Sequence, residues 1–476
     1  MKIKDTIKFA SGKFKPLLFD IYEAIKGTEK DYTEGRISKA ILLLAIPMVL
    51  EMVMESVFVI VDIYFVAQLN ADAVAVVGIT ESIMTLVYAI SVGLSTATTA
   101  IVARRIGEKR PEEAANSAFI AILTAIMVSF IFAIPGFFFS REILELMGVS
   151  EQAINQGHYF TMIMLSGNVV IILLFVMNAV FRSAGDAAIS MRVLWVANII
   201  NLILDPCFIF GLGPFPELGV TGAAVATTTG RGIAVLFQFY LLVYGKKRVQ
   251  IKFRYIQLKF QEFIQLIKLS LGGIGQSLIA TSSWIILMRI LSKYGNEVVA
   301  GYTIAIRIII FVLLPAWGLS NAASTLVGQN LGAKKPERAE KSVWIAGFSN
   351  VIFMGFLSIF FVAFSGYFIE ILAGNEDARV IEYGSKALRI ISIGFPAYAI
   401  GMVMIQAING AGDTTTPTII NFFTFWMIEI PLAAFLSLYY GYEYTGVFYS
   451  ILISETLMAV IGMIIFKRGK WKSKIV

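Results

Sequence analysis

The sequence predicts an all-α integral membrane protein in which twelve transmembrane helices form two six-helix lobes. Three observations support this fold class: the composition, a series of long apolar stretches and an internal repeat. Of 476 residues, 58% are hydrophobic and only 15% are charged, whereas about a quarter of the residues in a soluble domain are charged. This composition excludes a secreted disulfide scaffold, a disordered regulator and an ordinary cytosolic enzyme.

The apolar stretches are long enough to cross a bilayer. About 20 apolar residues in a helix span a hydrocarbon core of about 30 Å. Twelve such stretches are present, at residues 37–66, 73–103, 115–138, 158–181, 190–211, 218–244, 264–292, 297–329, 343–372, 383–409, 417–440 and 444–466. A backbone in lipid must satisfy its own hydrogen bonds, and the alternating pattern of a β-barrel is missing, so these stretches are predicted to be helices.

These spans divide the chain into two lobes and three polar segments. The predicted parts are a cytoplasmic tail at 1–36, an N-terminal lobe at 37–244, a basic linker at 245–263, a C-terminal lobe at 264–466 and a basic cytoplasmic tail at 467–476. The N-terminal tail does not have the pattern of a signal peptide. Its residues 17–25 are consistent with a short interfacial helix or with a loosely ordered tail.

Lysine and arginine predict the orientation. If the N-terminus is inside, most of the 39 Lys and Arg residues fall on the inner side, Arg182 among them. The opposite loops hold only Arg141, Lys293, Arg379 and Lys386. This bias predicts a multi-pass plasma-membrane protein with both termini cytoplasmic. The net charge of +7 therefore reflects membrane orientation and not nucleic-acid binding.

An internal repeat relates the two halves. GLSTATTAIVARRIGEKRPEEAANSA at 93–118 parallels GLSNAASTLVGQNLGAKKPERAEKSV at 318–343, and AGD recurs at 184–186 and 411–413. Each AGD is expected to form a sharp glycine turn whose Asp caps the next helix. Six helices per repeat give both halves the same orientation, as in transporters with a cavity between two lobes. The repeat alone does not prove transport.

The first span carries three acidic residues on one helical face. Glu51, Glu55 and Asp62 are spaced to form a narrow stripe, which must face protein or a water-filled cavity. An ionisable group at bilayer depth is costly and indicates function by default. Glu51 and Glu55 are equally consistent with structural hydrogen bonds between helices, whereas Asp62 favours a functional role.

Polar residues in the fourth and fifth spans extend this pattern. The fifth span contains Asn198, Asn201 and Asp205, again at helical spacing, and the fourth contains Asn178. Carboxylate and amide oxygens from different helices can hold a hard cation such as Na⁺. Two neighbouring carboxylates can instead share a proton, because like charges repel. Structural hydrogen bonding is the alternative, but Asp205, like Asp62, favours a functional role.

The second half lacks an equivalent cluster. The positions that the repeat pairs with Asp62, Asn201 and Asp205 are Leu287, Ile428 and Leu432. Ion coupling is therefore predicted in the N-terminal half. Glu429 and Glu455 look isolated by comparison, and either line the C-terminal half of a cavity or lie near a membrane boundary.

Enzymatic machinery is absent from the sequence pattern. The chain has one His and one Cys, no paired catalytic motif and no phosphate-binding loop. We therefore expect neither an enzyme nor a bound cofactor. The energy for transport is expected to come from an ion gradient or from a partner. The many Met and aromatic residues are consistent with a pliable cavity for apolar cations, but packing and lipid contact are their commoner roles.

Six motifs together resemble the multidrug and toxic compound extrusion (MATE) family of transporters. They are VDIYFVAQL at 61–69, GLSTATTAIVARRIG at 93–107, FRSAGD at 181–186, NIINLILDPCFIFG at 198–211, LGVTGAAVAT at 218–227 and VGQNLGAKKPERA at 327–339. The resemblance covers essentially all twelve helices. It implies two six-helix lobes that export organic, amphipathic cations in exchange for Na⁺ or H⁺ by alternating access.

The resemblance also implies a set of coupling residues. Carried over by motif, they are Asp62, Asn178, Asn201, Asp205 and Thr227. A coupling Na⁺ would lie at Asp62, Asn201 and Asp205, and further cavity acids would be Glu51, Glu55 and Glu429. The chain departs from the family pattern at Asn70 and Ser183, where glycine is usual. We expect a monomer in contact with membrane lipid.

Two rival functions remain. A lipid-linked oligosaccharide flippase of the same fold superfamily would have extra helices or a basic central cavity, whereas this chain has twelve spans and acidic clusters. A channel would conduct ions without a substrate, which electrical recording would reveal.

Overall fold

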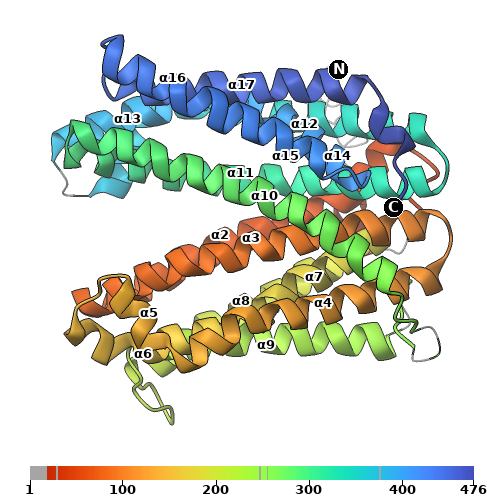
Figure 1. Ribbon diagram of the computed structural model, residues 1–476, viewed down its shortest axis with the longest axis horizontal. Coiled ribbons are helices and arrows are strands. Elements are labelled where there is room, and N and C mark those ends of the chain that lie inside the picture. The colour runs from red at the N-terminus through yellow and green to blue at the C-terminus, as the bar shows by residue number, and fades with distance from the viewer. Residues whose placement is uncertain (1–18, 28–29, 246–247, 253, 255, 375–376) are drawn as a thin grey trace, which may run out of the picture.

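The computed structural model describes residues 19–27, 30–245, 248–252, 254, 256–374 and 377–476. Within these residues all regular secondary structure is helical, which agrees with the predicted all-α fold. Figure 1 shows two helical bundles lying side by side, one from each half of the chain.

The first bundle is the N-terminal lobe. Its helices are α2 (Ile37–Val66), α3 (Ala71–Gly107), α4 (Pro111–Phe138), α5 (Ser140–Leu146), α6 (Glu151–Ser166), α7 (Asn168–Ala184), α8 (Ala187–Phe210) and α9 (Val220–Tyr244). Residues 19–26, which precede them, are also helical, which favours the helical alternative for residues 17–25 over a loosely ordered tail. Residues 17 and 18 lie outside the described residues.

The second bundle is the C-terminal lobe. Its helices are α10 (Phe260–Leu291), η2 (Ser292–Tyr294), α11 (Asn296–Gly332), α12 (Pro336–Ala373), α13 (Ala378–Ile393), α14 (Phe395–Gly410), α15 (Thr415–Asn421), the π-helical η3 (Phe422–Glu429), α16 (Ile430–Ala434), the π-helical η4 (Phe435–Tyr439), α17 (Thr445–Lys467) and η5 (Lys470–Ser473). The long apolar runs explain these helices, because a helix satisfies its own backbone in lipid.

The number of spans agrees with the sequence prediction. In the described residues eleven helical stretches are long and apolar enough to cross a membrane. A twelfth results if α13 and α14, which are bent by 55° at their junction, form one span. The bend lies at Gly394, and α14 begins at Phe395 with Pro396 in its first turn.

The repeat is visible in equivalent turns of the two lobes. Lys109 and Lys334 both adopt left-handed backbone conformations, with φ of 60° and 57°, and each is followed two residues later by the proline that starts α4 or α12. Gly185 and Gly412 form the predicted sharp turns, with φ of 93° and 88°.

The two AGD aspartates differ in their contacts. The Asp413 carboxylate accepts a hydrogen bond from the Thr416 backbone N–H and so caps α15. Asp186 makes no capping hydrogen bond to α8. The predicted cap is therefore confirmed in the second half and wrong in the first, because capping depends on the rotamer and not only on sequence position.

Helices of each lobe pack directly against the other lobe at the interface between them. Helix α2 packs against α11 of the C-terminal lobe as well as α8 of its own, and α10 packs against α3. In Figure 1, α10 (green) runs obliquely between the bundles. Leu44 and Met48 of α2 belong to a hydrophobic core that includes Ala322 and Val327 of α11. A movement between the lobes must therefore repack α2.

At one end of the bundles α3 and α11 touch through glycines. A Cβ atom on Gly107 would collide with the backbone carbonyl of Gln329, and one on Gly332 would collide with the carbonyl of Arg104. Gln329 Nε2 also donates to the Ser183 carbonyl at 2.7 Å. The lobes are thus closed against each other at this end.

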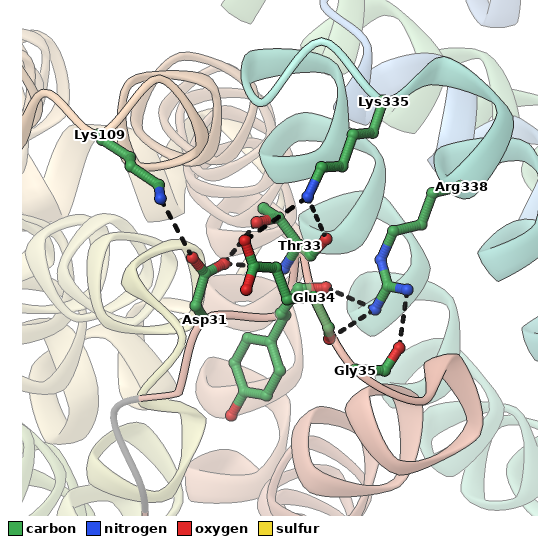
Figure 2. A network of polar contacts seen from close by, with 8 residues as sticks. Asp31, Thr33, Glu34, Gly35, Lys109, Lys335 and Arg338 are labelled. Atoms are coloured by element: carbon green, nitrogen blue, oxygen red, sulfur yellow. Dashed lines mark hydrogen bonds and ion pairs between the residues drawn. The ribbon is translucent and has the colours of Figure 1, made fainter.

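The segment at residues 31–35, which we call the bridging segment, contacts both lobes at the same end (Figure 2). On the N-terminal side, Asp31 pairs with Lys109 at 4.0 Å. On the other side, Arg338 donates to the Gly35 and Glu34 carbonyls, both at 2.8 Å, and Lys335 donates to the Thr33 carbonyl at 3.0 Å. The bridging segment therefore ties the α3–α4 turn to the α11–α12 turn.

The C-terminal tail adds a second link at this end. Arg104 Nη2 of α3 donates to the Lys474 carbonyl at 2.8 Å, and Lys474 Nζ pairs with Asp413 at 3.2 Å. The tail thus joins the two lobes where the basic turns gather.

Candidate functional site

Helices α8 and α9 hold a buried polar group in the N-terminal lobe. Asn201 Nδ2 donates to Asp205 Oδ1 and to Thr227 Oγ1, both at 3.2 Å. All three side chains are buried, and Asp205 is 0% exposed. The structure therefore brings together three of the five predicted coupling residues.

The carboxylate of Asp205 is only half satisfied. Its Oδ2 atom is buried and has no hydrogen-bond partner among the described residues. A buried acceptor without a donor costs free energy. A proton or a cation bound at Oδ2 would remove that cost.

Asp62 joins this group through electrostatics. It projects from α2, is half-buried, and lies within electrostatic range of Asp205. We call Asp62, Asn201, Asp205 and Thr227 the Asp205 cluster. Two carboxylates at this depth repel each other, so a positive charge between them is favourable.

Asn178 lies in a different group. Its Nδ2 donates to Glu51 Oε1 at 3.2 Å, and its Oδ1 accepts from Gln238 Nε2 at 2.6 Å. The same Glu51 atom pairs with Arg182 Nη1 at 3.1 Å. The structure thus links Asn178 to an ion pair between α2 and α7, and no side-chain hydrogen bond connects it to Asp205 in the described residues.

Arg182 corrects one part of the orientation argument. The sequence count treated it as a basic residue of an inner segment, but it is 7% exposed and lies within α7. The Arg182 guanidinium points into the helix bundle, where Glu51 is its counterion. A positional count of Lys and Arg cannot distinguish such a residue from a loop cation.

Glu55 forms the second ion pair of the lobe. Its Oε1 accepts from Arg231 Nη2 of α9 at 3.1 Å. The Arg231 guanidinium also lies 4.9 Å from the Phe58 ring centroid and donates to the Tyr88 hydroxyl at 3.4 Å. These contacts fasten α2 to α9 and α3 just beside the Asp205 cluster.

Sequence reasoning missed Arg231 and Glu81. Glu81 of α3 is half-buried and lies within electrostatic range of both Asp62 and Arg231. Both residues were visible as charges inside predicted spans, and Arg231 follows Thr227 by one helical turn. That spacing was the available signal, because residues four apart share a helix face.

Asn198 has a structural contact. Its Nδ2 donates to the Met54 carbonyl of α2 at 3.4 Å, and Trp195 Nε1 donates to the Leu50 carbonyl at 3.1 Å. These bonds hold α8 against α2. Helix α2 carries Asp62 and α8 carries Asp205, so these two hydrogen bonds also fix the two aspartates relative to each other.

The C-terminal lobe contains an acidic pair that the sequence did not predict. Glu429 and Glu455 both line one cavity and interact electrostatically. Of the two alternatives that the sequence left open, the one in which they line a cavity of the C-terminal half agrees with the structure, but the two acids are not isolated from each other. Glu429 lies on η3 and Glu455 on α17, and these two helices pack against each other. The packing places the two side chains at the same cavity, although they are far apart in the sequence.

The amide of Asn201 presents a donor to its neighbours in the Asp205 cluster. In the described chain no group of three or more His, Cys, Asp or Glu side chains is placed to hold a metal. Asn201 presents its amide nitrogen, not its oxygen, to both Asp205 and Thr227. A Na⁺ ion prefers oxygen ligands, so Na⁺ binding would require Asn201 to turn over.

Comparisons with known proteins extend across both lobes. A family model described as MatE matches residues 47–207 and 274–435. The chain is 24% identical to "Probable multidrug resistance protein YpnP" of Bacillus subtilis, over 93% of this chain and 98% of that protein. It is 25% identical to "FAD transporter" of Shewanella oneidensis, over 89% and 93% respectively.

A solved structure of a MOP superfamily transporter from Pyrococcus furiosus has the same fold. Its TM-score is 0.87 at 24% sequence identity, and the match covers 94% of this chain and 98% of that one. The two-lobe arrangement drawn from the internal repeat therefore recurs in an independently determined structure.

Proposed function

Since the chain belongs to the MatE family of multidrug and toxic compound extrusion transporters, we propose that it is a secondary active multidrug efflux antiporter. It exports organic, amphipathic cations and takes up H⁺ or Na⁺ in exchange. It works as a transporter in the plasma membrane with both termini cytoplasmic, and not as an enzyme. The acidic character of both lobes disfavours the flippase alternative, because a lipid-linked oligosaccharide carries anionic phosphate.

One observation carries the coupling proposal. Asp205 Oδ2 is buried without a donor, while its Oδ1 and the neighbouring Asn201 and Thr227 are hydrogen-bonded. Among the oxygens of Asp205 and Thr227, Oδ2 of Asp205 alone lacks a hydrogen-bond donor in the described residues, and a bound cation would supply the missing positive partner. Asp62, in electrostatic range on α2, gains from the same neutralisation.

The coupling follows from the position of α2 between the lobes. In the outward-facing state a cation reaches the Asp205 cluster and neutralises charge beside α2. The mutual repulsion of Asp62 and Asp205 falls, and the preferred packing of α2 against α8 and α11 changes. Substrate is released outward, and the lobes return to the inward-facing state. One charge moving inward across 100 mV supplies about 2.3 kcal/mol, which corresponds to about fifty-fold accumulation.

The donor pattern favours H⁺ as the coupling ion. Asn201 donates to Asp205, so the cluster supplies one free carboxylate oxygen and not a shell of oxygens. A single proton fits that arrangement without rearrangement, whereas Na⁺ needs more oxygen ligands. A Na⁺-driven protein would therefore show a reoriented Asn201 when loaded.

Proteoliposomes test the proposal directly. Ethidium movement is followed under an imposed pH gradient and, separately, under a Na⁺ gradient. We expect export driven by the pH gradient and its loss in Asp205→Asn, which cannot exchange a proton. Asp72→Asn, at the first turn of α3 and outside the cluster, is the matched control and should retain export. Normal gradient-driven export by Asp205→Asn would show that coupling lies elsewhere.

A further inference from the structure

The helix at residues 19–26, which we call the N-terminal helix, lies against the start of α2. Lys39 Nζ of α2 pairs with Asp20 Oδ1 at 2.6 Å and with Glu23 Oε2 at 2.8 Å. Ala24 is 2% exposed and belongs to the hydrophobic core that α2 shares with α11. One face of the N-terminal helix is therefore fastened to the body of the protein.

The opposite face of the N-terminal helix is apolar and exposed. Phe19 is 64% exposed, Tyr22 62% and Ile25 39%. At about 100° per residue these side chains form a stripe on the side of the helix that faces away from Asp20 and Glu23. We call these three residues the apolar stripe. An exposed stripe on a helix that is held in place from behind marks an interaction surface.

The position of the helix indicates what covers this stripe. Gly27, which follows the helix with φ of 79°, lies beside the start of α8, because a Cβ atom there would be 3.1 Å from Arg192 Nη2. Trp195, Val196 and Ile199, further along α8, are exposed residues of a helix that is long and apolar enough to cross a membrane. Such side chains face lipid, and Trp is enriched where a span meets the bilayer surface. The N-terminal helix thus lies where α2 and α8 enter the bilayer.

Basic side chains accompany the apolar stripe. Lys26, next to Ile25, is exposed, and so are Arg36 before α2 and Arg192 near the start of α8. The two acids of the N-terminal helix are on its other face, where they pair with Lys39. Apolar residues with basic neighbours are the composition of a helix that lies in a membrane interface and attracts anionic lipid headgroups.

The N-terminal helix is also close to the bridging segment in the sequence. Only three residues separate Gly27 from Asp31, the first residue of the bridging segment. Next to it, Tyr32 is 3% exposed, and its hydroxyl donates to the Gly185 carbonyl at 3.1 Å. Figure 2 shows how the bridging segment continues to the α11–α12 turn of the other lobe. A helix fixed at the membrane surface therefore limits how far the bridging segment can leave these contacts.

We propose that the N-terminal helix binds the bilayer surface through the apolar stripe, prefers anionic lipid headgroups, and thereby keeps the bridging segment in contact with both lobes. A bilayer suits the stripe better than a protein partner does, because the helix adjoins the lipid-facing side of α8 and has basic neighbours. The inference goes beyond the proposed antiport and does not depend on it, since membrane binding requires neither a substrate nor an ion gradient.

A spin label at position 22 tests the membrane contact in the full-length protein reconstituted into liposomes. Tyr22→Cys is labelled after replacement of Cys207 by serine, and its collisions with oxygen, which concentrates in lipid, and with a water-soluble nickel chelate are compared. We expect oxygen to reach the label more readily than the chelate does. A label at Glu112, an exposed residue in the first turn of α4, is the control and should show the reverse.

Two results of this measurement would overturn the membrane contact. Access of the nickel chelate to position 22 equal to that at Glu112 would show that the stripe faces water. Protection of position 22 from both reagents would show that protein covers the stripe, either residues 1–18 or a second copy of the chain.

Removal of the aromatic side chains tests the link to the bridging segment. Distances between spin labels at Glu112 and Glu337, near the starts of α4 and α12, report whether the lobes are open or closed at this end. In Phe19→Ser/Tyr22→Ser we expect the ratio of open to closed molecules to rise at least about threefold. Leu146→Ser/Met147→Ser, which removes exposed apolar side chains at and beside the end of α5, is the control and should leave the distances unchanged.

Lys26→Gln tests the preference for anionic headgroups and changes only one exposed side chain. One basic side chain near an anionic surface contributes about fivefold to binding. We therefore expect the open-to-closed ratio to rise up to about fivefold in vesicles of phosphatidylcholine with phosphatidylglycerol, and to stay unchanged in phosphatidylcholine alone. Thermal unfolding verifies that each variant is folded. Unchanged distances in the folded aromatic variant would overturn the link to the bridging segment, and an equal response of Lys26→Gln in both lipids would overturn the preference for anionic lipid.

Discussion

At the residue scale, the coupling proposal rests on the surroundings of Asp205. Its burial excludes water, and its one hydrogen bond from Asn201 fixes the carboxylate while leaving Oδ2 free. Pro206 follows it in α8 and lacks the backbone N–H that would bond to the Leu202 carbonyl. The helix thus lacks one backbone hydrogen bond beside Asp205.

The hydroxyl of Thr227 positions Asn201, so its loss should weaken coupling without removing the acid. In Thr227→Val the amide loses one acceptor, and a hydrogen bond is worth about 0.5–1.5 kcal/mol. We expect gradient-driven ethidium export to slow by about two- to tenfold. Thr229→Val, which changes an exposed threonine on the same helix, serves as control. Equal export rates for both valine variants would contradict the role given to Thr227.

The ion pair between Asp31 and Lys109 is expected to be insensitive to pH in the physiological range. Partial burial raises the pKa of its carboxyl, but hydrogen bonds from the Thr33 hydroxyl and backbone N–H lower it further, so that it lies below the ordinary value of 3.8. Because the pKa is lowered in the folded state, the ionised Asp31 carboxylate stabilises the fold at pH values above its ordinary pKa. This stabilisation is lost only as the pH falls through the folded-state pKa.

The difference in thermal stability between the wild type and Asp31→Asn should therefore stay constant from about pH 8 to about pH 5. Unfolding midpoints measured across this range check the prediction. Any pH dependence of transport in the range then has to come from other groups. A stability difference that changes between these pH values would contradict the interpretation of Asp31.

At the residue scale, the sequence predicted the polar positions but not their partners. Helical spacing and the cost of intramembrane charge were sufficient to select Asp62, Asn201 and Asp205. Helical spacing did not show that Asn178 bonds to Glu51. Partners on other helices depend on interhelical packing, about which the sequence of a single helix carries no information.

At the scale of the element, α2 connects the Asp205 cluster to the lobe interface. Its first half packs into a core shared with α11, whereas Glu55 and Asp62 follow further along the same helix. A change of charge beside Asp62 can therefore alter how α2 lies against both lobes. The boundary at 37–244 describes the order of the chain, but the packing of α2 crosses between the lobes.

The glycine contact between α3 and α11 offers a test of the closed end. Gly107→Ala places a methyl group against the Gln329 carbonyl, and overpacking of this kind costs about 1–3 kcal/mol. We expect a lower unfolding midpoint and an increased population of the inward-open state. Gly78→Ala is the control on the same helix, because a Cβ there meets no atom within 4 Å. Similar behaviour of the two variants would show that the contact is not tight in the membrane.

At the scale of the whole molecule, the end of the bundles at which α3 meets α11 is held closed by the bridging segment and the C-terminal tail. The bridging segment contacts Lys109 on one lobe and Lys335 and Arg338 on the other, and Lys474 links α3 to Asp413. These contacts join equivalent turns of the repeat. Opening of the lobes toward the cytoplasm must break one side of them.

Removing the C-lobe side of this link should favour the inward-open state. In the double variant Lys335→Ala/Arg338→Ala the hydrogen bonds to the Thr33, Glu34 and Gly35 carbonyls are lost. We expect the inward-open population to rise at least threefold, since each lost bond contributes about 0.5–1.5 kcal/mol.

Spin labels measure that population. Cysteines at Glu112 and Glu337, exposed residues near the starts of α4 and α12, are introduced after replacement of Cys207 by serine, and the distance distribution between them is recorded. Lys341→Ala, an exposed lysine further along α12, is the control. Identical distributions in the double variant and the control would show that the bridging segment does not hold the lobes together.

The sequence by itself determined the class of the molecule. Apolar length determined the helices, the repeat determined two equivalent lobes, and the cost of buried charge selected Asp62 and Asp205. The tertiary structure alone decided which charges meet. It paired Glu51 with Arg182, left Asp205 Oδ2 without a donor, and brought Glu429 and Glu455 into one cavity. The physical reason is that periodicity reports which face of a helix is polar, whereas rotation, depth and neighbour are set by packing against the other helices.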